Sequence, residues 1–352
     1  MIEVPGHYDP ENARRFGYRP DAQALFDAAQ AARRDLHLLP SSSDLRRTHL
    51  VLIDLQRDFC FPEGTLYVGG RSGAGALEDN DRIARFIYSN LGAISEITCT
   101  LDSHLPFQIF FAPFWVDRHG APLQPHRTIV ADQIRSGDVR PNPNVAGAVG
   151  APDTTWLTTQ AAFYCDELAK AGRYVLYLWP PHCLTGGDGH ALSGVIQEAR
   201  LFHAYARSAR NGVEIKGMHA LSENYSVFSP EVLFMHDGAS LATRNDVLIS
   251  QLLQEDRLII AGQASSHCVK SSIDDLLTAI EKRDKTLARR VYILEDAMSA
   301  VAVPHPAKPG AFIADFTDEA RSALGRFADA GMRVVKTTTP ISDWAGFNDG
   351  RS

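Results

Sequence analysis

The sequence has 352 residues, of which 45% are hydrophobic and 22% are charged, so the chain is long enough to bury a sizeable core. This composition excludes extensive disorder. A formal net charge of −7 argues against a nucleic-acid partner, which requires a concentrated basic surface. We therefore expect a small-molecule partner.

The cysteine pattern and the N-terminus indicate the compartment. The chain has five cysteines, at positions 60, 99, 165, 183 and 268, which form no CxxC pair and no regular spacing. This pattern gives little support to a zinc ribbon or a disulfide framework. The N-terminus lacks an apolar segment after a basic start, and no stretch approaches the roughly 18 apolar residues of a membrane span. We expect a cytoplasmic protein with no membrane partner.

The elements predicted along the chain begin with an extension over residues 1–46, in which residues 21–36 form an amphipathic helix. After it, short apolar runs alternate with helical patterns, which is typical of βαβ units and a mostly parallel sheet. Strands are predicted at 49–54, 94–102, 213–217, 257–262, 289–296 and 332–336. Helices are predicted at 77–91, 189–208, 244–254, 267–283 and 316–330.

Residues 105–173 break this rhythm with a long excursion that is rich in aromatic residues and then in proline and glycine. We expect it to pack on the core as an insertion in a domain spanning residues 47–345. The fold class is α/β: a Rossmann-like three-layer sandwich with a mostly parallel central sheet. Its ligand site should lie at the carboxyl ends of the strands.

Cys268 follows the apolar run "RLIIAG" and the loop "QASSH", at the start of a helical pattern. A helix N-terminus favours a thiolate, and its free N–H groups can face the oxyanion that forms when a thiolate attacks a carbonyl. The position therefore suits a nucleophile. Taken alone, a single cysteine at such a position is more often a buried thiol that packs as a small hydrophobic side chain.

Asp54 and Lys216 each end a predicted strand, so a parallel sheet brings both to the edge that carries Cys268. There a carboxylate can take the thiol proton and return it to a leaving amine, while an ammonium group stabilises the thiolate. The alternative for either residue is a salt-bridged surface charge.

A second cluster is the DxH pair Asp102 and His104, whose side chains point the same way on an extended strand end. His182, in "WPPHC", supplies a third ligand if its loop lies nearby. Carboxylate and imidazole ligands suit zinc, iron or manganese, with water in the open positions. The alternative is a pair of hydrogen-bonded loop side chains.

Together these segments resemble the nicotinamidase/isochorismatase superfamily of cysteine hydrolases, over about residues 49–104 and 179–340. "VLIDLQRDFCFPEGTLYVGG" is similar to the opening block and implies Asp54 as the catalytic aspartate. "IKGMHALSENYSVF" is similar to the block with the catalytic lysine, here Lys216. "IIAGQASSHCVKSSIDDL" is similar to the nucleophile block, here Cys268.

"DSH" and "WPPHC" resemble the metal-dependent nicotinamidase branch and imply Asp102, His104 and His182 as ligands of a divalent metal, zinc first and iron or manganese next. The resemblance also implies a cis peptide between Gln263 and Ala264 that serves the oxyanion hole. It further implies a substrate pocket and a homo-oligomeric assembly. The implied pocket residues are Phe59, Trp179, Tyr225 and His267.

One position departs from the family pattern, since many bacterial nicotinamidases have a further histidine where this chain has Phe110. We expect an amidohydrolase that converts nicotinamide to nicotinate and ammonia through a Cys268 thioester. The alternatives are a metal-independent amidase of another small amide, of the maleamate or carbamoyl type, and a non-catalytic ligand-binding protein of the same fold.

Overall fold

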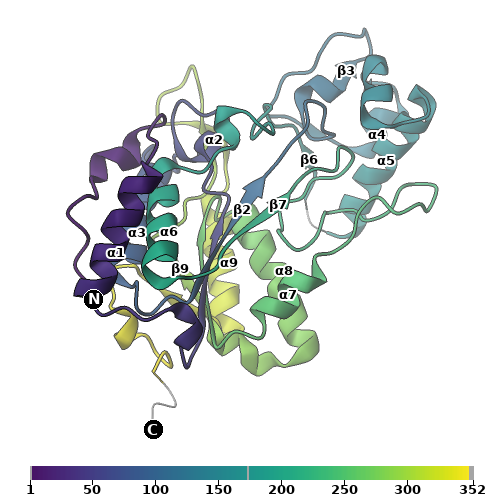
Figure 1. The fold of residues 1–352 in the computed structure, drawn as a ribbon. Coiled ribbons are helices and arrows are strands. Elements are labelled where there is room, and N and C mark those ends of the chain that lie inside the picture. The colour runs from purple at the N-terminus through teal and green to yellow at the C-terminus, as the bar shows by residue number, and fades with distance from the viewer. Residues whose placement is uncertain (1, 173, 349–352) are drawn as a thin grey trace.

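The computed structural model describes residues 2–172 and 174–348, and its centre is a six-stranded sheet (Figure 1). Every neighbouring pair in the sheet is parallel, in the order β12–β9–β8–β1–β2–β7. Numbered along the chain, this order reads 3-2-1-4-5-6, as in doubly wound folds, with the switch point between β1 and β8. The strands are β1 (Thr48–Ile53), β2 (Glu96–Asp102), β7 (Asn211–Lys216), β8 (Arg257–Gly262), β9 (Val291–Leu294) and β12 (Arg333–Val335).

Helices cover both faces of the sheet (Figure 1). α3 (Gly75–Ser89) and α6 (Gly194–Arg207) share one core with Leu50 and Leu52 of β1, and α1 (Ala22–Asp35) packs on α6. α7 (Asp246–Leu252), α8 (Cys268–Arg283) and α9 (Thr317–Asp329) share the other core with Val51 and Ile53. Among the described residues, no helix is both long and apolar enough to cross a membrane.

The predicted three-layer sandwich with a parallel sheet is confirmed. β1 and β8 are buried along their whole length, which is why their sequences are continuous apolar runs without a polar face. The helix predicted at 189–208 begins only at Gly194, because residues Asp188–His190 form a separate 3-10 turn and Ser193 is the N-cap. A single helical turn, α2 (Arg57–Cys60), follows β1.

Residues 105–172 form a compact unit beside the sheet, at the upper right of Figure 1, and supply most of one hydrophobic cluster. This cluster reaches Phe59, Trp179 and Val301, so the excursion shares its core with the loops at the carboxyl edge of the sheet. The short elements of this unit and the adjoining loops are β3 (Trp115–Asp117), β4 (Thr128–Ile129), α4 (Ala131–Arg135), β5 (Val139–Pro141), α5 (Thr154–Lys170) and β6 (Leu176–Tyr177).

A small hairpin and several 3-10 turns complete the structure. β10 (Ala302–Pro304) and β11 (Phe312–Asp315) pair antiparallel between β9 and α9. The 3-10 turns are η1 (Pro10–Arg14), η2 (Ser41–Ser43), η3 (Ala112–Phe114), η4 (Pro143–Val145), η5 (Gly147–Val149), η6 (Asp188–His190), η7 (Lys285–Arg290) and η8 (Ile341–Asp343).

Candidate active site

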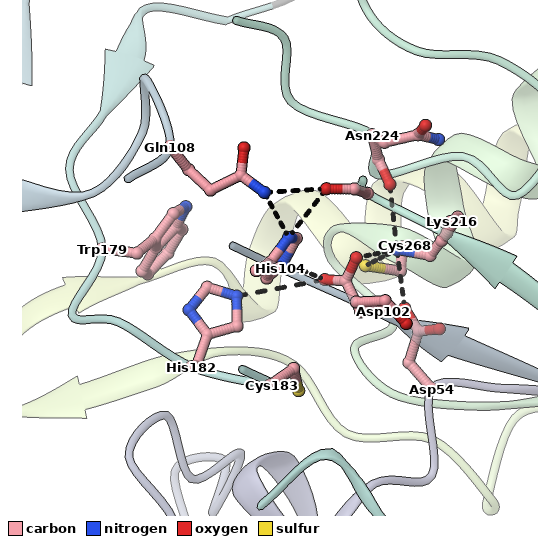
Figure 2. A network of polar contacts seen from close by, with 12 residues as sticks. Asp54, Asp102, His104, Gln108, Trp179, His182, Cys183, Lys216, Asn224 and Cys268 are labelled. Atoms are coloured by element: carbon pink, nitrogen blue, oxygen red, sulfur yellow. Dashed lines mark hydrogen bonds and ion pairs between the residues drawn. The ribbon is translucent and has the colours of Figure 1, made fainter. Parts of the chain in front are cut away.

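Asp54, Lys216 and Cys268 meet at the carboxyl edge of the sheet, on both sides of the switch point (Figure 2). Lys216 Nζ lies 2.9 Å from Asp54 Oδ2 and 3.6 Å from Cys268 Sγ. It also lies 3.0 Å from Asp102 Oδ1 and donates to the Asn224 carbonyl oxygen at 2.9 Å. One ammonium group is therefore shared between the thiol, two carboxylates and a backbone carbonyl.

The backbone around these residues is tightly fitted. Asp54 has a φ of 47°, which turns the chain sharply at the end of β1. Beside it, Gly262 has a φ of 129°, and a Cβ on this residue would lie 2.0 Å from the Ile53 carbonyl oxygen. Only glycine fits there, and this close approach lets β8 end directly against β1, before the loop that carries Cys268.

Burial and charge decide the protonation of the three groups. Burial raises the pKa of the Cys268 thiol well above its usual value, although Lys216 opposes this shift. Burial also raises the pKa of Asp54. Burial lowers the pKa of Lys216, but the carboxylates of Asp102 and Asp54 outweigh it and leave that pKa well above its usual value. Before a substrate binds, the site therefore holds a protonated thiol at Cys268, a more basic carboxyl group at Asp54 and a charged ammonium group at Lys216.

The loop before Cys268 leaves backbone donors free at the nucleophile. The peptide bond between Gln263 and Ala264 is cis. Cys268 is the first residue of α8, and among the described residues the backbone N–H groups of Ala264 and Cys268 donate to no other protein group. Gln263 is fixed by hydrogen bonds to Asp79 and Ser299. Free N–H groups at a helix start suit an anionic oxygen.

Asp102, His104 and His182 also converge, next to the Asp54, Lys216 and Cys268 cluster (Figure 2). His104 Nε2 lies 3.0 Å from Asp102 Oδ2, and His182 Nε2 lies 3.9 Å from the same oxygen. Each imidazole faces a backbone carbonyl with its other nitrogen: His104 Nδ1 lies 3.1 Å from Gly217 O, and His182 Nδ1 lies 2.8 Å from Pro180 O. Because a carbonyl only accepts, both Nδ1 atoms carry the hydrogen, and both Nε2 lone pairs face the carboxylate.

This arrangement fits a metal ion. His104 Nε2 is buried without a hydrogen-bond partner among the described residues, and two acceptor atoms 3.0 Å apart require a cation or proton between them. Burial, with His104 nearby, lowers the pKa of His182 to about 4, so its imidazole is neutral and able to ligate. Burial raises the pKa of Asp102, but His104 and Lys216 outweigh it and leave it below its usual range. The donor set suits zinc, iron or manganese.

Two other residues shape this cluster. Gly217 has a φ of 87°, and a Cβ there would lie 2.6 Å from Asp102 Oδ1, so glycine is required directly after Lys216. Phe110 occupies the place expected for a further ligand, with its ring 4.9 Å from that of His104. A phenyl ring offers no donor atom, so three protein ligands remain.

A second acidic group, formed by His49, Glu96 and Glu255, lies at the opposite edge of the sheet. Arg47 pairs with Glu96 at 3.0 Å and with Glu255 at 3.1 Å. Its guanidinium group already neutralises these carboxylates, so this group does not share the chemistry of the first.

The four pocket residues expected from sequence line one narrow cavity beside Cys268, with a volume of about 30 Å³. Trp179 Nε1 donates to Tyr225 Oη at 2.9 Å, and the rings of both contact His267, at 5.4 and 5.2 Å. Phe59 contacts the ring of His182 at 5.4 Å on the metal-ligand side. Aromatic rings form much of the wall of this cavity, as is usual for a small-molecule site.

Several supporting residues were not predicted from sequence. Thr100 donates to the Asp54 carboxylate and accepts from the Asp54 N–H. Gln108 donates to Gly217 O, the same carbonyl that orients His104. Asp58 accepts from the backbone N–H of Cys183 at 2.7 Å, which fixes the loop carrying His182. Each acts through a tertiary hydrogen bond, and the only local signal was a polar residue within an apolar segment.

Comparison with known proteins identifies the fold. No family model matches the sequence, and no curated protein matches it in sequence. Among solved structures, the yeast nicotinamidase bound to the inhibitor nicotinaldehyde matches with a TM-score of 0.51 at 19% identity, covering 82% of this chain and 99% of that chain. An Acinetobacter baumanii nicotinamidase/pyrazinamidase matches with a TM-score of 0.48 at 19% identity, covering 84% and 99% of the two chains.

At this identity, the likeness to the yeast enzyme shows the fold alone. The chain has the fold of a nicotinamidase, which confirms at the level of fold the resemblance seen in the sequence. The activity has to be argued from the site residues.

Proposed function

We propose that the protein is a cysteine amidohydrolase that cleaves the carbon–nitrogen bond of a small planar carboxamide, with nicotinamide as the leading substrate. The observation that carries this proposal is the position of the Lys216 ammonium group, which contacts Asp54, Asp102 and Cys268 at the mouth of an aromatic cavity. Three buried charges beside a buried thiol are costly to maintain in a protein that only binds a ligand. This cost disfavours the non-catalytic alternative.

The proposed reaction has two halves, formation and hydrolysis of a thioester, and the same groups act in both. Asp54 takes the proton of Cys268 as the sulfur attacks the carboxamide carbon, and the N–H groups of Ala264 and Cys268 donate to the oxyanion. The carbon–nitrogen bond breaks, Asp54 returns the proton, and ammonia leaves. Water then attacks the thioester, Asp54 accepts its proton, and the acid leaves as the thiol re-forms. Lys216 stabilises the anionic sulfur in both halves.

The substrate ring would lie among Phe59, Trp179 and Tyr225, which line the cavity. Asp102, His104 and His182 would hold a divalent metal, most suitably zinc, with iron or manganese as alternatives. When bound, this metal supplies an open coordination position that a pyridine nitrogen can occupy. The ring nitrogen and the stacked aromatic rings together would place the carboxamide against Cys268.

One observation favours a second candidate. Phe110 fills the place of a possible further ligand, which leaves a small donor set and makes an amidase without a pyridine-binding metal physically reasonable. Such an enzyme would act on a maleamate or carbamoyl compound with the same Asp54, Lys216 and Cys268 chemistry.

We also propose that residues 47–345 are one hydrolase domain, with 1–46 as an extension and about 105–173 as an insertion. The shared hydrophobic clusters support this division, because the extension packs on α6 while the insertion joins the cavity wall.

The test is ammonia release from nicotinamide, benzamide, maleamate and an N-carbamoyl amino acid by the purified protein, before and after chelation. We expect nicotinamide to be hydrolysed fastest and to lose most of its advantage over benzamide when the metal is stripped. Benzamide has the same carboxamide but no ring nitrogen, so it is the matched control, and metal add-back should restore the difference. A protein isolated without metal that gains nothing from zinc, iron or manganese and prefers maleamate would replace nicotinamide with the second candidate.

A further inference from the structure

A larger cavity of about 420 Å³ lies away from the proposed active site, between the N-terminal extension, α2, α6 and β7. One of its walls is apolar, formed by Pro20, Leu192, Leu201 and Val213. Three arginines, Arg19, Arg57 and Arg200, also line it. The cavity thus combines an apolar wall with guanidinium groups, and the proposed hydrolysis uses none of these residues.

Arg57 is the unusual member of this set. Its side chain is buried, with a residue exposure of 6%, and its Nε has no hydrogen-bond partner in the part of the chain that the structure describes. Its only hydrogen bond from the guanidinium group goes from Nη2 to the Tyr18 carbonyl oxygen at 3.1 Å, and among the described residues no carboxylate lies within 4.0 Å of it. A buried arginine is normally paired with an acid, because an uncompensated buried charge is costly.

Among the described residues no carboxylate forms an ion pair with Arg57, although Asp188 acts on it electrostatically and the Phe16 ring centroid lies 5.7 Å from its guanidinium carbon. Arg200 is held by neutral groups, since Nε donates to Gln197 Oε1 at 2.8 Å and Nη1 donates to Asn211 Oδ1 at 2.7 Å. Arg19 pairs loosely with the exposed Asp188 at 3.5 Å. The cavity is therefore lined by three guanidinium groups, of which one is paired with a carboxylate among the described residues, and this balance favours a positive potential there.

The start of α6 adds to this potential. Gly194, the first residue of this 14-residue helix, lines the same cavity, and the N-cap Ser193 makes no side-chain hydrogen bond to the first turn. The positive end of the helix dipole and uncapped N–H groups thus lie beside Arg57.

We propose that this cavity binds a small organic oxyanion, a carboxylate or phosphate group on an apolar body, with Arg57 as its main charge partner. The anion supplies the acid that Arg57 lacks, Arg19 and Arg200 contact it from the rim, and the apolar wall covers its body. The guanidinium fork suits carboxylate and phosphate oxygens because it donates two parallel hydrogen bonds. This site is independent of the proposed amidase activity.

The test is isothermal titration of the full-length protein with benzoate and with inorganic phosphate, at ionic strength matched with sodium chloride. We expect saturable binding of both anions, tighter for benzoate because of its apolar ring, and no binding of uncharged benzyl alcohol. Arg57→Gln should weaken benzoate binding at this site by about tenfold or more. Arg200→Gln should weaken it less. Arg135→Gln is the control, because Arg135 lies in the insertion and is already paired with Asp132 and Asp166.

Circular dichroism checks that each variant is folded. If Arg57→Gln does not fold, Arg57→Lys and Arg200→Gln still test the proposal. Arg57→Lys keeps the positive charge but loses the planar guanidinium group with its two parallel donors, so it should bind benzoate more weakly than the wild type. Benzoate binding that is unchanged in Arg57→Gln, or in both Arg57→Lys and Arg200→Gln, would belong to another site and would overturn the proposal. Absence of saturable binding of either anion to the wild type would overturn it as well.

Discussion

The carboxyl edge of the central sheet and the insertion beside it supply different parts of the site. Asp54, Lys216 and Cys268 come from the ends of β1, β7 and β8, three strands of one parallel sheet. Trp179 comes from the cluster that the insertion builds around itself, and it reaches the same cavity from the other side. In this molecule a regular layer positions the reactive groups, while an irregular unit shapes the space in front of them.

This difference implies that substitutions in the two regions should affect catalysis in different ways. The strand ends are fixed by backbone pairing in the central sheet, so a change there removes chemistry without moving its neighbours. The cavity wall is fixed by side-chain packing and single hydrogen bonds, so a change there should alter substrate binding more than turnover.

The largest effect is expected for Cys268→Ala, which removes the proposed nucleophile without adding bulk. Amide hydrolysis should fall by roughly 10³-fold or more, with the fold unchanged by circular dichroism. Cys165→Ala is the matched control, because Cys165 is also a buried thiol but lies in α5. If Cys268→Ala retained a substantial fraction of wild-type turnover, a metal-activated water would be the better mechanism.

Lys216→Met should be the next most severe change, since it removes the ammonium group that Asp54, Asp102 and Cys268 share. We expect kcat to fall by roughly 100-fold with little change in KM, because the charge stabilises a transient thiolate. Two buried carboxylates lose their partner, so the free energy of unfolding should fall by about 3–5 kcal/mol. Steady-state kinetics and denaturant unfolding measure the two effects.

Lys270→Met is the control for this variant, because it breaks a half-exposed pair between Lys270 and Asp274 on α8. It should leave both kcat and stability close to wild type. A Lys216→Met protein with normal kcat would remove Lys216 from the mechanism.

A smaller effect is expected from Asp79, which ties the nucleophile loop to α3 by accepting from Gln263 Nε2 and Ser299 Oγ. Burial raises the pKa of Asp79 from 3.8 to about 6, although these hydrogen bonds oppose the shift. The folded state therefore binds the proton more tightly than the unfolded state does. Stability from this group is complete below about pH 4 and is lost as the pH rises through about 6, by about 3 kcal/mol.

Asp79→Asn should remove this part of the pH dependence, as measured by urea unfolding between pH 4 and 8. Asp27→Asn, on the exposed face of α1, is the control and should keep the wild-type profile. If both variants followed the wild-type curve, Asp79 would titrate alike in the folded and unfolded chains.

The smallest effect is expected for Trp179→Phe, which keeps an aromatic wall but removes the hydrogen bond from Nε1 to Tyr225 Oη. KM should rise about fivefold with kcat nearly unchanged, since a net hydrogen bond contributes about 1 kcal/mol. Trp156→Phe, which loses a hydrogen bond to Asp237 on the far side of α5, is the control. A large fall in kcat for Trp179→Phe would mean that the wall also places the reacting atoms.

Much of the sheet could be predicted from the sequence, for a physical reason. β1 and β8 are buried on both faces, so most of each strand is an apolar run in the sequence. The carboxyl ends of parallel strands lie at one edge of the sheet, so polar residues at these ends must meet there. That is enough to bring Asp54 and Lys216 together with Cys268. The ligand set of Asp102, His104 and His182 needed the resemblance, because His182 lies on a loop with no periodic signal.

The insertion could not be predicted in the same detail. α5 is its longest helix, and most of its buried residues share one face, but this face includes the polar Gln160, while Trp156 and Phe163 lie outside it, so the apolar pattern is weak. The contacts of Thr100, Gln108 and Asp58 were equally hidden, because a hydrogen bond across the fold leaves no pattern in the local sequence. The same limit applies to Arg57, since only the three-dimensional structure shows that its Nε has no hydrogen-bond partner among the described residues.

The strand order also has a consequence for how the protein folds. The central strand β1 pairs with β2, which follows soon in the chain, but its other neighbour β8 belongs to the second half of the sequence. During synthesis one edge of β1 therefore stays unpaired until the segment from Arg257 to Gly262 has left the ribosome. Contacts between segments so far apart in the sequence form slowly. Asp54 and Cys268 meet only when that pairing closes. We expect N-terminal fragments that end before β8 to be inactive and prone to aggregate.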